Sequence, residues 1–265
     1  MENKNSLPKP QVQDHIRIND SVITRQERKV LYWLAPRMPD WVTPDVLTAF
    51  GLFGSILIFV GYALTYYSPA YLWLATLGFV INWFGDSLDG TLARHRKIER
   101  PRYGFFIDHI VDAVSEVLVF IGLGLSPYLS LELALFALVS YLLASIYVYL
   151  TTYVNGVFRI SYSGMGPTSL RLVAIAANTL VFIFGNPAIP LPAIWLIPES
   201  FSLTLFDLVV TAIIVFIVGL FFVNVVGTAR SLSDLDTAKQ RKKQGKRLKR
   251  RSAPAAVDES GKKPA

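Results

Sequence analysis

The sequence lacks cysteine altogether, and charged residues are scarce along most of its length. Without cysteine the chain can form neither disulfide bonds nor thiolate metal sites. Charged residues make up only 17% of the chain, whereas hydrophobic residues make up 52%. This balance is typical of a polytopic helical membrane protein and excludes an ordinary soluble domain. The first residues do not lead into an apolar core, so we expect no cleavable signal peptide.

Basic residues are concentrated near the C-terminal end. Residues 228–265 carry 12 Lys and Arg against 4 Asp and Glu, whereas the rest of the chain carries 14 against 15. Nine of these basic residues fall within residues 239–251. We expect a basic, disordered cytoplasmic tail that either binds anionic lipid head groups or acts as a topology anchor. Nucleic-acid binding is not expected, because nothing else in the chain resembles a nucleic-acid module.

The hydropathy pattern indicates an all-α integral membrane protein with six transmembrane helices. Each apolar stretch is close to the roughly 20 residues that a bilayer requires. The stretches cover residues 47–66, 70–93, 104–125, 129–153, 170–184 and 203–226. The predicted organisation is a polar N-terminal part (1–40), a six-helix catalytic domain (41–227) and the basic tail (228–265).

An amphipathic helix is predicted before the first span, over residues 24–34. Thr24 and Glu27 have the spacing of a capping box. Apolar residues on one side and basic residues on the other favour a helix that lies in the membrane interface. A solvated surface helix is the alternative.

The placement of Lys and Arg predicts the orientation of the six spans. Neither residue occurs in the loops near Ser68 and Ser126 or in residues 186–200. With six spans, every Lys and Arg then falls on the opposite side, which the positive-inside rule makes cytoplasmic. We therefore expect both termini and the active site to be cytoplasmic, in a bacterial inner membrane or an equivalent one.

Four carboxylates border the loop between the second and third predicted spans. Asp86 and Asp89 are three residues apart, and Asp108 and Asp112 are four residues apart. Helical pitch places each pair on one helix face, so two adjacent helices could direct all four into one pocket. Carboxylates within a membrane segment are costly and are tolerated when a cation, usually a metal ion, neutralises them.

This stretch resembles the CDP-alcohol phosphatidyltransferase family. The family signature is Asp-x2-Asp-Gly-x2-Ala-Arg-x8-Gly-x3-Asp-x3-Asp, and its eight defined positions are matched by Asp86, Asp89, Gly90, Ala93, Arg94, Gly104, Asp108 and Asp112. One spacer has nine residues instead of eight, within the cytoplasmic loop, where an extra residue is easily accommodated. Thr43, Pro44 and Asp45 also resemble the family's entry to its first helix, which usually reads Thr-Pro-Asn.

The resemblance implies roles for the acidic residues. Asp86, Asp89 and Asp108 would bind metal, and Asp112 would take the proton from an acceptor hydroxyl while lying close to the metal. Hard oxygen ligands suit Mg²⁺ or Mn²⁺, and four carboxylates could hold two such ions.

The resemblance also implies a binding site for the CDP moiety. Gly90 and Ala93 would let the helix backbone approach the nucleotide, and Gly104 would permit tight packing at the start of the third span. Arg94 would donate to a phosphate.

Three residues outside the signature are further candidates for contact with a ligand. Glu116 continues the face of Asp112 and is either a hydrogen-bonding partner of a ligand or a structural residue. Arg159 and Arg171 are candidates for an acceptor or lipid phosphate, although both could simply mark helix ends. His95 and His109 are not expected to bind metal.

The favoured function is transfer of a phosphatidyl group from a CDP-linked lipid, CDP-diacylglycerol, to a small polyol or polyol phosphate, with release of CMP. The alternative within the family is transfer of a phospho-head group from a soluble CDP-alcohol to diacylglycerol. A membrane prenyltransferase fits less well, because Gly85 rather than Asn precedes Asp86 and no second acidic motif follows Asp112. A non-enzymatic Mg²⁺ carrier also fits less well, because it has no need of the Gly90, Ala93 and Arg94 pattern. The resemblance also suggests a homodimer.

Overall fold

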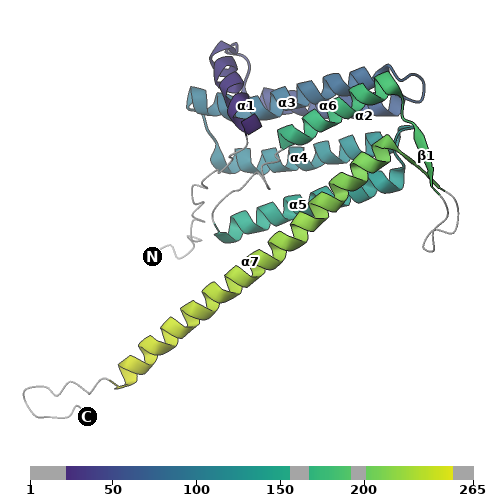
Figure 1. Ribbon diagram of the computed structural model, residues 1–265. Helices are drawn as coiled ribbons and strands as arrows, with labels where there is room; N and C mark the ends of the chain where they lie inside the picture. The colour runs from purple at the N-terminus through teal and green to yellow at the C-terminus, as the bar shows by residue number, and fades with distance from the viewer. Residues whose placement is uncertain (1–21, 156–166, 192–200, 253–265) are drawn as a thin grey trace, which may run out of the picture. The chain divides into compact units, whose positions relative to one another are not determined.

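The computed structural model describes residues 22–155, 167–191 and 201–252, and most of them are helical (Figure 1). Helix α1 (Val22–Leu34) and the short 3-10 helix η1 (Ala35–Arg37) come first. Long helices then coincide with the six predicted apolar stretches. They are α2 (Pro44–Leu64), α3 (Tyr71–Arg96), α4 (Pro101–Gly124), α5 (Leu131–Asn155), α6 (Pro167–Phe184) and α7 (Leu205–Ser252).

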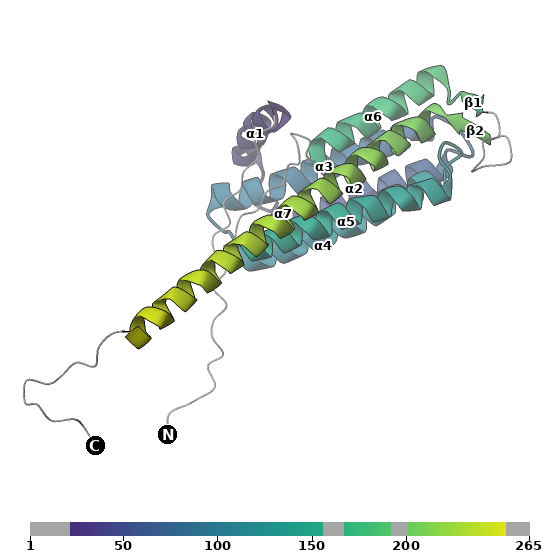
Figure 2. The same ribbon diagram turned by 60° about the horizontal axis from the view of Figure 1, so that its bottom comes forward.

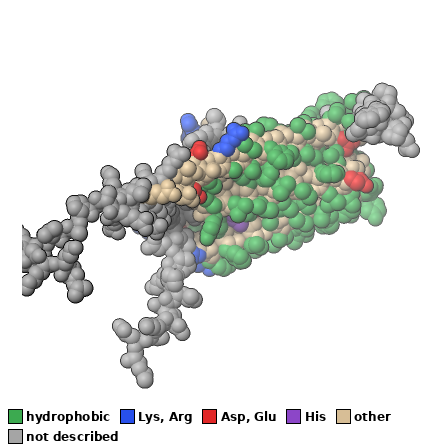
Figure 3. All heavy atoms as spheres, turned by 90° about the horizontal axis from the view of Figure 1, so that it is seen from below, with side chains coloured by type: hydrophobic (Ala, Val, Ile, Leu, Met, Phe, Trp, Pro, Cys, Tyr) green, Lys and Arg blue, Asp and Glu red, His purple; other side chains and the backbone are tan. Residues whose placement is uncertain are grey.

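Four of the described helices are long and apolar enough to cross a membrane. These segments are Pro44–Leu64, Leu131–Val154, Pro167–Phe184 and Phe206–Ala238. Helices α3 and α4 are not among them, because they carry the acidic residues of the motif, which lower their hydropathy. Hydrophobic side chains cover much of the face in Figure 3, and large ones such as Phe136 and Leu150 on α5 are exposed. This apolar surface is that of an integral membrane protein.

Helix α1 packs against the C-terminal part of α3. Leu31 and Ala35 are buried against Leu88 and Leu92 of α3. The helix begins two residues before Thr24, so Thr24 is not its N-cap and the predicted capping box is wrong. Glu27 binds side chains of other helices instead, because tertiary packing supplies it with better-placed donors.

Helices α2 and α3 approach each other closely at glycine positions. A Cβ atom on Gly54 of α2 would lie 2.4 Å from the Asn82 backbone nitrogen, and one on Gly85 of α3 would lie 2.4 Å from the Leu47 carbonyl oxygen. Only glycine allows two helix backbones to come so near, as is common in membrane helices. This contact is not evident from the sequence pattern, and it positions the two helices that carry Thr48, Asp86 and Asp89.

Helices α4 and α6 pack against this pair, and α5 packs against α4. Helix α2 also packs against α4, α4 packs against α5, and α3 packs against α6 (Figures 1 and 2). Buried polar groups connect the helices: Tyr62 donates a hydrogen bond to Asn178 (2.9 Å), which donates to Thr76 (3.2 Å). Asn82 donates to the Gly51 carbonyl (3.1 Å). Asn82 and Asn178 therefore make interhelical hydrogen bonds, as their positions within apolar stretches suggest.

A short β-hairpin connects α6 to α7, which the all-α prediction did not include. Strands β1 (Ala188–Leu191) and β2 (Phe201–Thr204) pair antiparallel, with Ile189 opposite Leu203. Four-residue strands are too short to leave a clear periodic signal in the sequence.

Helix α7 continues well beyond its predicted end. From the sequence, the last span is expected to end at residue 226 and the tail to be disordered from residue 228, but the helix runs to Ser252. Leu, Lys, Arg and Gln dominate residues 239–251, and all of them favour helix. The chain divides into two compact units between Phe221 and Phe222, within α7.

Candidate active site

Three carboxylates from α3 and α4 converge in one pocket. Asp86 lies on α3, and Asp108 and Asp112 lie one turn apart on α4. One ligand atom from each lies within 4.8 Å of the other two, and we call this group the carboxylate cluster. Three carboxylate oxygens at this spacing fit Mg²⁺ or Mn²⁺, which prefer hard oxygen donors. The pocket is also lined by Thr48, Gly51, Asn82, Val111 and Ser115.

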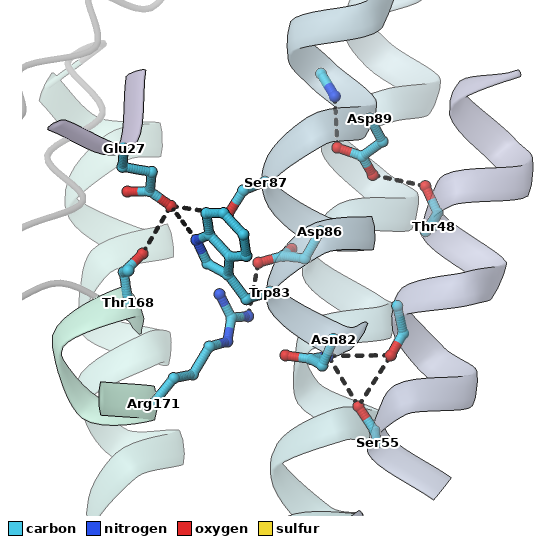
Figure 4. A network of polar contacts seen from close by, with 12 residues as sticks. Glu27, Thr48, Ser55, Asn82, Trp83, Asp86, Ser87, Asp89, Thr168 and Arg171 are labelled. Carbon is cyan, nitrogen blue, oxygen red and sulfur yellow. Dashed lines mark hydrogen bonds and ion pairs between the residues drawn. The ribbon is translucent and has the colours of Figure 1, made fainter. Parts of the chain in front are cut away.

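Asp89 lies apart from the carboxylate cluster, although the spacing predicts that all four aspartates converge. Its Oδ2 atom accepts a hydrogen bond of 2.6 Å from the Thr48 hydroxyl of α2, and its Oδ1 atom accepts one from the Gly90 backbone (Figure 4). Thr48 also lines the pocket of the cluster. Asp89 is therefore held beside the site by α2, and metal binding by this residue stays a prediction.

Arg171 of α6 forms an ion pair with the carboxylate cluster (Figure 4). Its Nη2 atom donates to Asp86 Oδ2 at 2.6 Å, and only 14% of the Arg171 side chain is exposed. A charge buried to this degree requires a partner, and the arginine supplies positive charge to three acidic groups. From the sequence, Arg171 is a candidate either for a substrate phosphate or for a helix-end marker, and its contact with Asp86 is not part of that expectation. The other candidate, Arg159, lies outside the described residues.

An apolar cavity of about 180 Å³ adjoins the cluster. Its polar lining residues include Asp112, Ser115, Glu116 and Arg171. The rest of its wall is mostly apolar and includes Phe79, Val119, Phe120, Leu123, Ala177, Phe206 and Val210. A lipid-like substrate could thus place its apolar part in the cavity and its polar part beside Asp112.

Two buried oxygen atoms on α4 have no hydrogen-bond partner among the described residues. They are the Ser115 hydroxyl and Oε2 of Glu116, and both residues line the apolar cavity. Buried polar atoms are normally hydrogen-bonded, so such atoms beside a cavity indicate where a ligand would bind. Ser115 was not a candidate from the sequence, because a single serine in an apolar helix carries no distinctive pattern.

The sequence model of the CDP-alcohol phosphatidyltransferase family matches residues 41–206, which is more than half of the chain. The chain belongs to this family. The resemblance seen in the acidic motif is therefore confirmed. Members are transferases of phospholipid biosynthesis that act on CDP-alcohol donors and alcohol acceptors, and they generally depend on a divalent metal.

Curated relatives of the chain include three proteins named for two different activities. Cholinephosphotransferase 1 of Danio rerio is 37% identical over 98 residues, which cover 34% of this chain and 25% of the relative. Phosphatidylinositol phosphate synthase of Cutibacterium acnes is 35% identical over 85 residues, covering 32% and 38%. Cholinephosphotransferase 1 of Rattus norvegicus is 29% identical over 164 residues, covering 58% and 40%. The matched region thus spans two fifths or less of each relative's length.

The motif positions expected to bind the CDP moiety lie at the ends of α3 and α4. Gly90, Ala93 and Arg94 are on the last turns of α3, where Arg94 is exposed and donates to the Thr91 hydroxyl at 3.1 Å. Gly104 is in the first turn of α4, and a Cβ atom there would meet no described atom within 4 Å. Tight helix packing therefore does not account for Gly104, contrary to the expectation from the sequence.

Two residues near the motif, Asp45 and His109, are not members of the carboxylate cluster, although His109 Nδ1 lies 3.9 Å from Asp108 Oδ2. Asp45 forms an ion pair with Arg100 in which both side chains are about half exposed. His109 packs against the Phe105 and Tyr149 rings, and its Nδ1 atom lies 2.7 Å from the Phe105 carbonyl oxygen. Neither residue is part of the group that could hold a metal among the described residues.

Proposed function

We propose that this protein transfers a phosphatidyl group from a CDP-linked lipid, CDP-diacylglycerol, to a hydroxyl group of a small polyol or polyol phosphate. The observation that carries the proposal is the carboxylate cluster at one end of an apolar cavity. The reaction needs both features, since a diphosphate requires neutralisation of its charge and a lipid donor requires an apolar environment.

The acidic residues would serve in metal binding and in proton transfer. Asp86, Asp89, Asp108 and Asp112 would hold Mg²⁺ or Mn²⁺, with two ions as in other two-metal sites of phosphoryl transfer. When bound, the ions neutralise charge on the diphosphate and so favour its cleavage. Asp89 could join this set after the Thr48 hydroxyl releases its Oδ2 atom.

Asp112 would act as the general base. Its carboxylate accepts the proton of the acceptor hydroxyl while the hydroxyl oxygen forms a bond to the phosphorus distal to cytidine. The bond between that phosphorus and the bridging oxygen breaks, and the bridging oxygen leaves with CMP. The products are the phosphatidyl ester of the acceptor and CMP.

The remaining candidates would position the two substrates. Gly90, Ala93 and Gly104 leave room for the cytidine diphosphate, and Arg94 donates to one of its phosphates. Arg171 and Arg159 would bind the phosphate of the acceptor or of the lipid. The guanidinium of Arg171 has several donor groups, so a phosphate could replace Asp86 as a partner without leaving the charge unpaired.

We further propose six spans with both termini and the active site in the cytoplasm, in a bacterial inner membrane or an equivalent one. The absence of Lys and Arg from the three opposite connections supports this orientation. The division into a polar N-terminal part, a six-helix domain and a basic tail is retained, with the tail binding anionic lipids. A homodimer is also proposed.

A second candidate is transfer of a phospho-head group from a soluble CDP-alcohol to a lipid alcohol such as diacylglycerol. Two relatives are named for cholinephosphotransferase activity. In addition, the unpartnered Glu116 oxygen in the apolar cavity could accept a hydrogen bond from a neutral lipid hydroxyl.

CMP release by the purified protein in detergent with Mg²⁺ tests both candidates. CDP-diacylglycerol is offered with glycerol 3-phosphate, inositol, inositol phosphate or serine, and CDP-choline or CDP-ethanolamine is offered with diacylglycerol. Release in the first set that is lost in Asp112→Asn would support the favoured reaction. Release only in the second set would establish the alternative. If neither set of substrates gave CMP release, the transferase proposal would be refuted, and a prenyltransferase or a Mg²⁺ carrier would be the remaining candidates.

A further inference from the structure

One carboxylate oxygen of α1 connects three helices. The Oε1 atom of Glu27 accepts hydrogen bonds from the Trp83 indole nitrogen (2.7 Å), the Ser87 hydroxyl (2.9 Å) and the Thr168 hydroxyl (2.9 Å), as Figure 4 shows. Trp83 and Ser87 belong to α3, and Thr168 belongs to the first turn of α6. All three donors are uncharged and the acceptor is a carboxylate oxygen, an acceptor whose hydrogen bonds are stronger than those between neutral groups.

This connection lies one helical turn from the carboxylate cluster. Thr168 and Arg171 are three residues apart on α6, so they share one face of that helix. On α3, Asp86 lies between Trp83 and Ser87. The N-terminal end of α6 is therefore attached to α3 twice, through Glu27 at Thr168 and through the ion pair of Arg171 with Asp86.

The helix that carries Glu27 is itself firmly placed. Leu31 and Ala35 are almost fully buried against Leu88 and Leu92 of α3. Four residues separate Glu27 from Leu31, so the apolar contact and the carboxylate lie on the same side of α1. The carboxylate is thus presented to α3 and α6 by a docked helix rather than by a flexible segment.

We infer that Glu27 is a positioning residue for the active site: by holding Thr168 beside α3, it determines where the Arg171 guanidinium lies relative to Asp86. The consequence for catalysis rests on the proposed function, whereas the consequence for metal binding does not. Arg171 binds the Asp86 carboxylate that a divalent cation would also bind, and a positive charge beside the cluster opposes a second one. Weakening the contact of Arg171 with Asp86 should therefore strengthen metal binding. It should also slow phosphatidyl transfer, because the guanidinium is no longer placed to bind a phosphate.

The test measures Mn²⁺ binding to the full chain in detergent by the electron paramagnetic resonance of free Mn²⁺. Thr168→Val removes one donor to Glu27 while keeping the shape of the side chain. We expect it to lower the Mn²⁺ Kd by about two- to fivefold, which is the lower part of the change that one hydrogen bond of ordinary net strength can produce, because the Arg171–Asp86 ion pair itself remains. Arg171→Gln should lower the Kd by about tenfold, because it removes the competing charge. The double variant should bind no more tightly than Arg171→Gln alone.

Thr76→Val is the matched control. The Thr76 hydroxyl also connects α3 to α6, through Asn178, but it lies outside the residues that line the cluster or the cavity. We expect this variant to lower the melting temperature about as much as Thr168→Val and to leave the Mn²⁺ Kd unchanged.

The inference is overturned if Thr168→Val lowers the melting temperature but leaves the Kd at the wild-type value. It is also overturned if the effect of Thr168→Val persists in full when Arg171 is already glutamine. Should the expected Kd pattern appear in a protein that releases no CMP, the positioning role of Glu27 stands and the proposed function fails.

Discussion

Replacing Gly54 with alanine should separate α2 from α3 and destabilise the protein. A Cβ atom at this position would lie 2.4 Å from the Asn82 backbone nitrogen and 2.8 Å from the Gly78 carbonyl oxygen. Both atoms belong to the backbone of α3, so no side-chain rotation can relieve the overlap. The helices must move apart by about 1 Å to restore van der Waals contact.

The expected change in the free energy of unfolding is the balance of two opposing effects. Overpacking of a well-packed contact costs about 1–3 kcal/mol, and alanine in place of glycine in a helix gains up to about 1 kcal/mol. Because the overlap is with rigid backbone, we expect a net loss of about 2 kcal/mol in the free energy of unfolding. For a chain of this size that corresponds to a fall in melting temperature of roughly 4–8 °C.

Tryptophan fluorescence during heating in detergent measures this change, since Trp73 and Trp83 both lie on α3. Gly219→Ala on α7 is the matched control, because a Cβ atom there meets no described atom within 4 Å. We expect the control to melt at or slightly above the wild-type temperature. CMP release by Gly54→Ala should also fall, since displacement by about 1 Å in a catalytic site can lower the rate about 100-fold. If Gly54→Ala melts with the wild type, close backbone contact does not hold α2 against α3, and the reasoning is refuted.

Three further predictions concern the site directly. Asp112→Asn should lower CMP release by at least about 100-fold, as expected for loss of a general base, and a smaller loss would assign the proton transfer to another group. Treatment with EDTA should abolish CMP release, and Mg²⁺ or Mn²⁺ should restore it; activity that survives chelation would contradict the metal role of the carboxylate cluster. Thr48→Val should cost about 1–3 kcal/mol because it leaves an Asp89 oxygen without its donor. An unchanged melting temperature for Thr48→Val would show that water or another donor satisfies Asp89 equally well.

Much of the site could be predicted from the sequence because its pattern is local. Asp108 and Asp112 are four residues apart, and any helix places such residues on one face. The same holds for the apolar stretches, whose length and composition predict helices α2 to α7 without knowledge of their neighbours. Family membership also follows from closely spaced residues, since the signature falls within residues 86–112.

The tertiary structure decided which helix faces meet, and local spacing carries no information about that. Asp89 shares a helix with Asp86 but bonds to Thr48, 41 residues away, because glycines allow α2 to approach α3. Arg171 reaches Asp86 across 85 residues, and Glu27 reaches Thr168 across 141. Each of these contacts depends on how several helices pack together. The sequence by itself therefore determined the chemical groups of the site, and packing determined their partners.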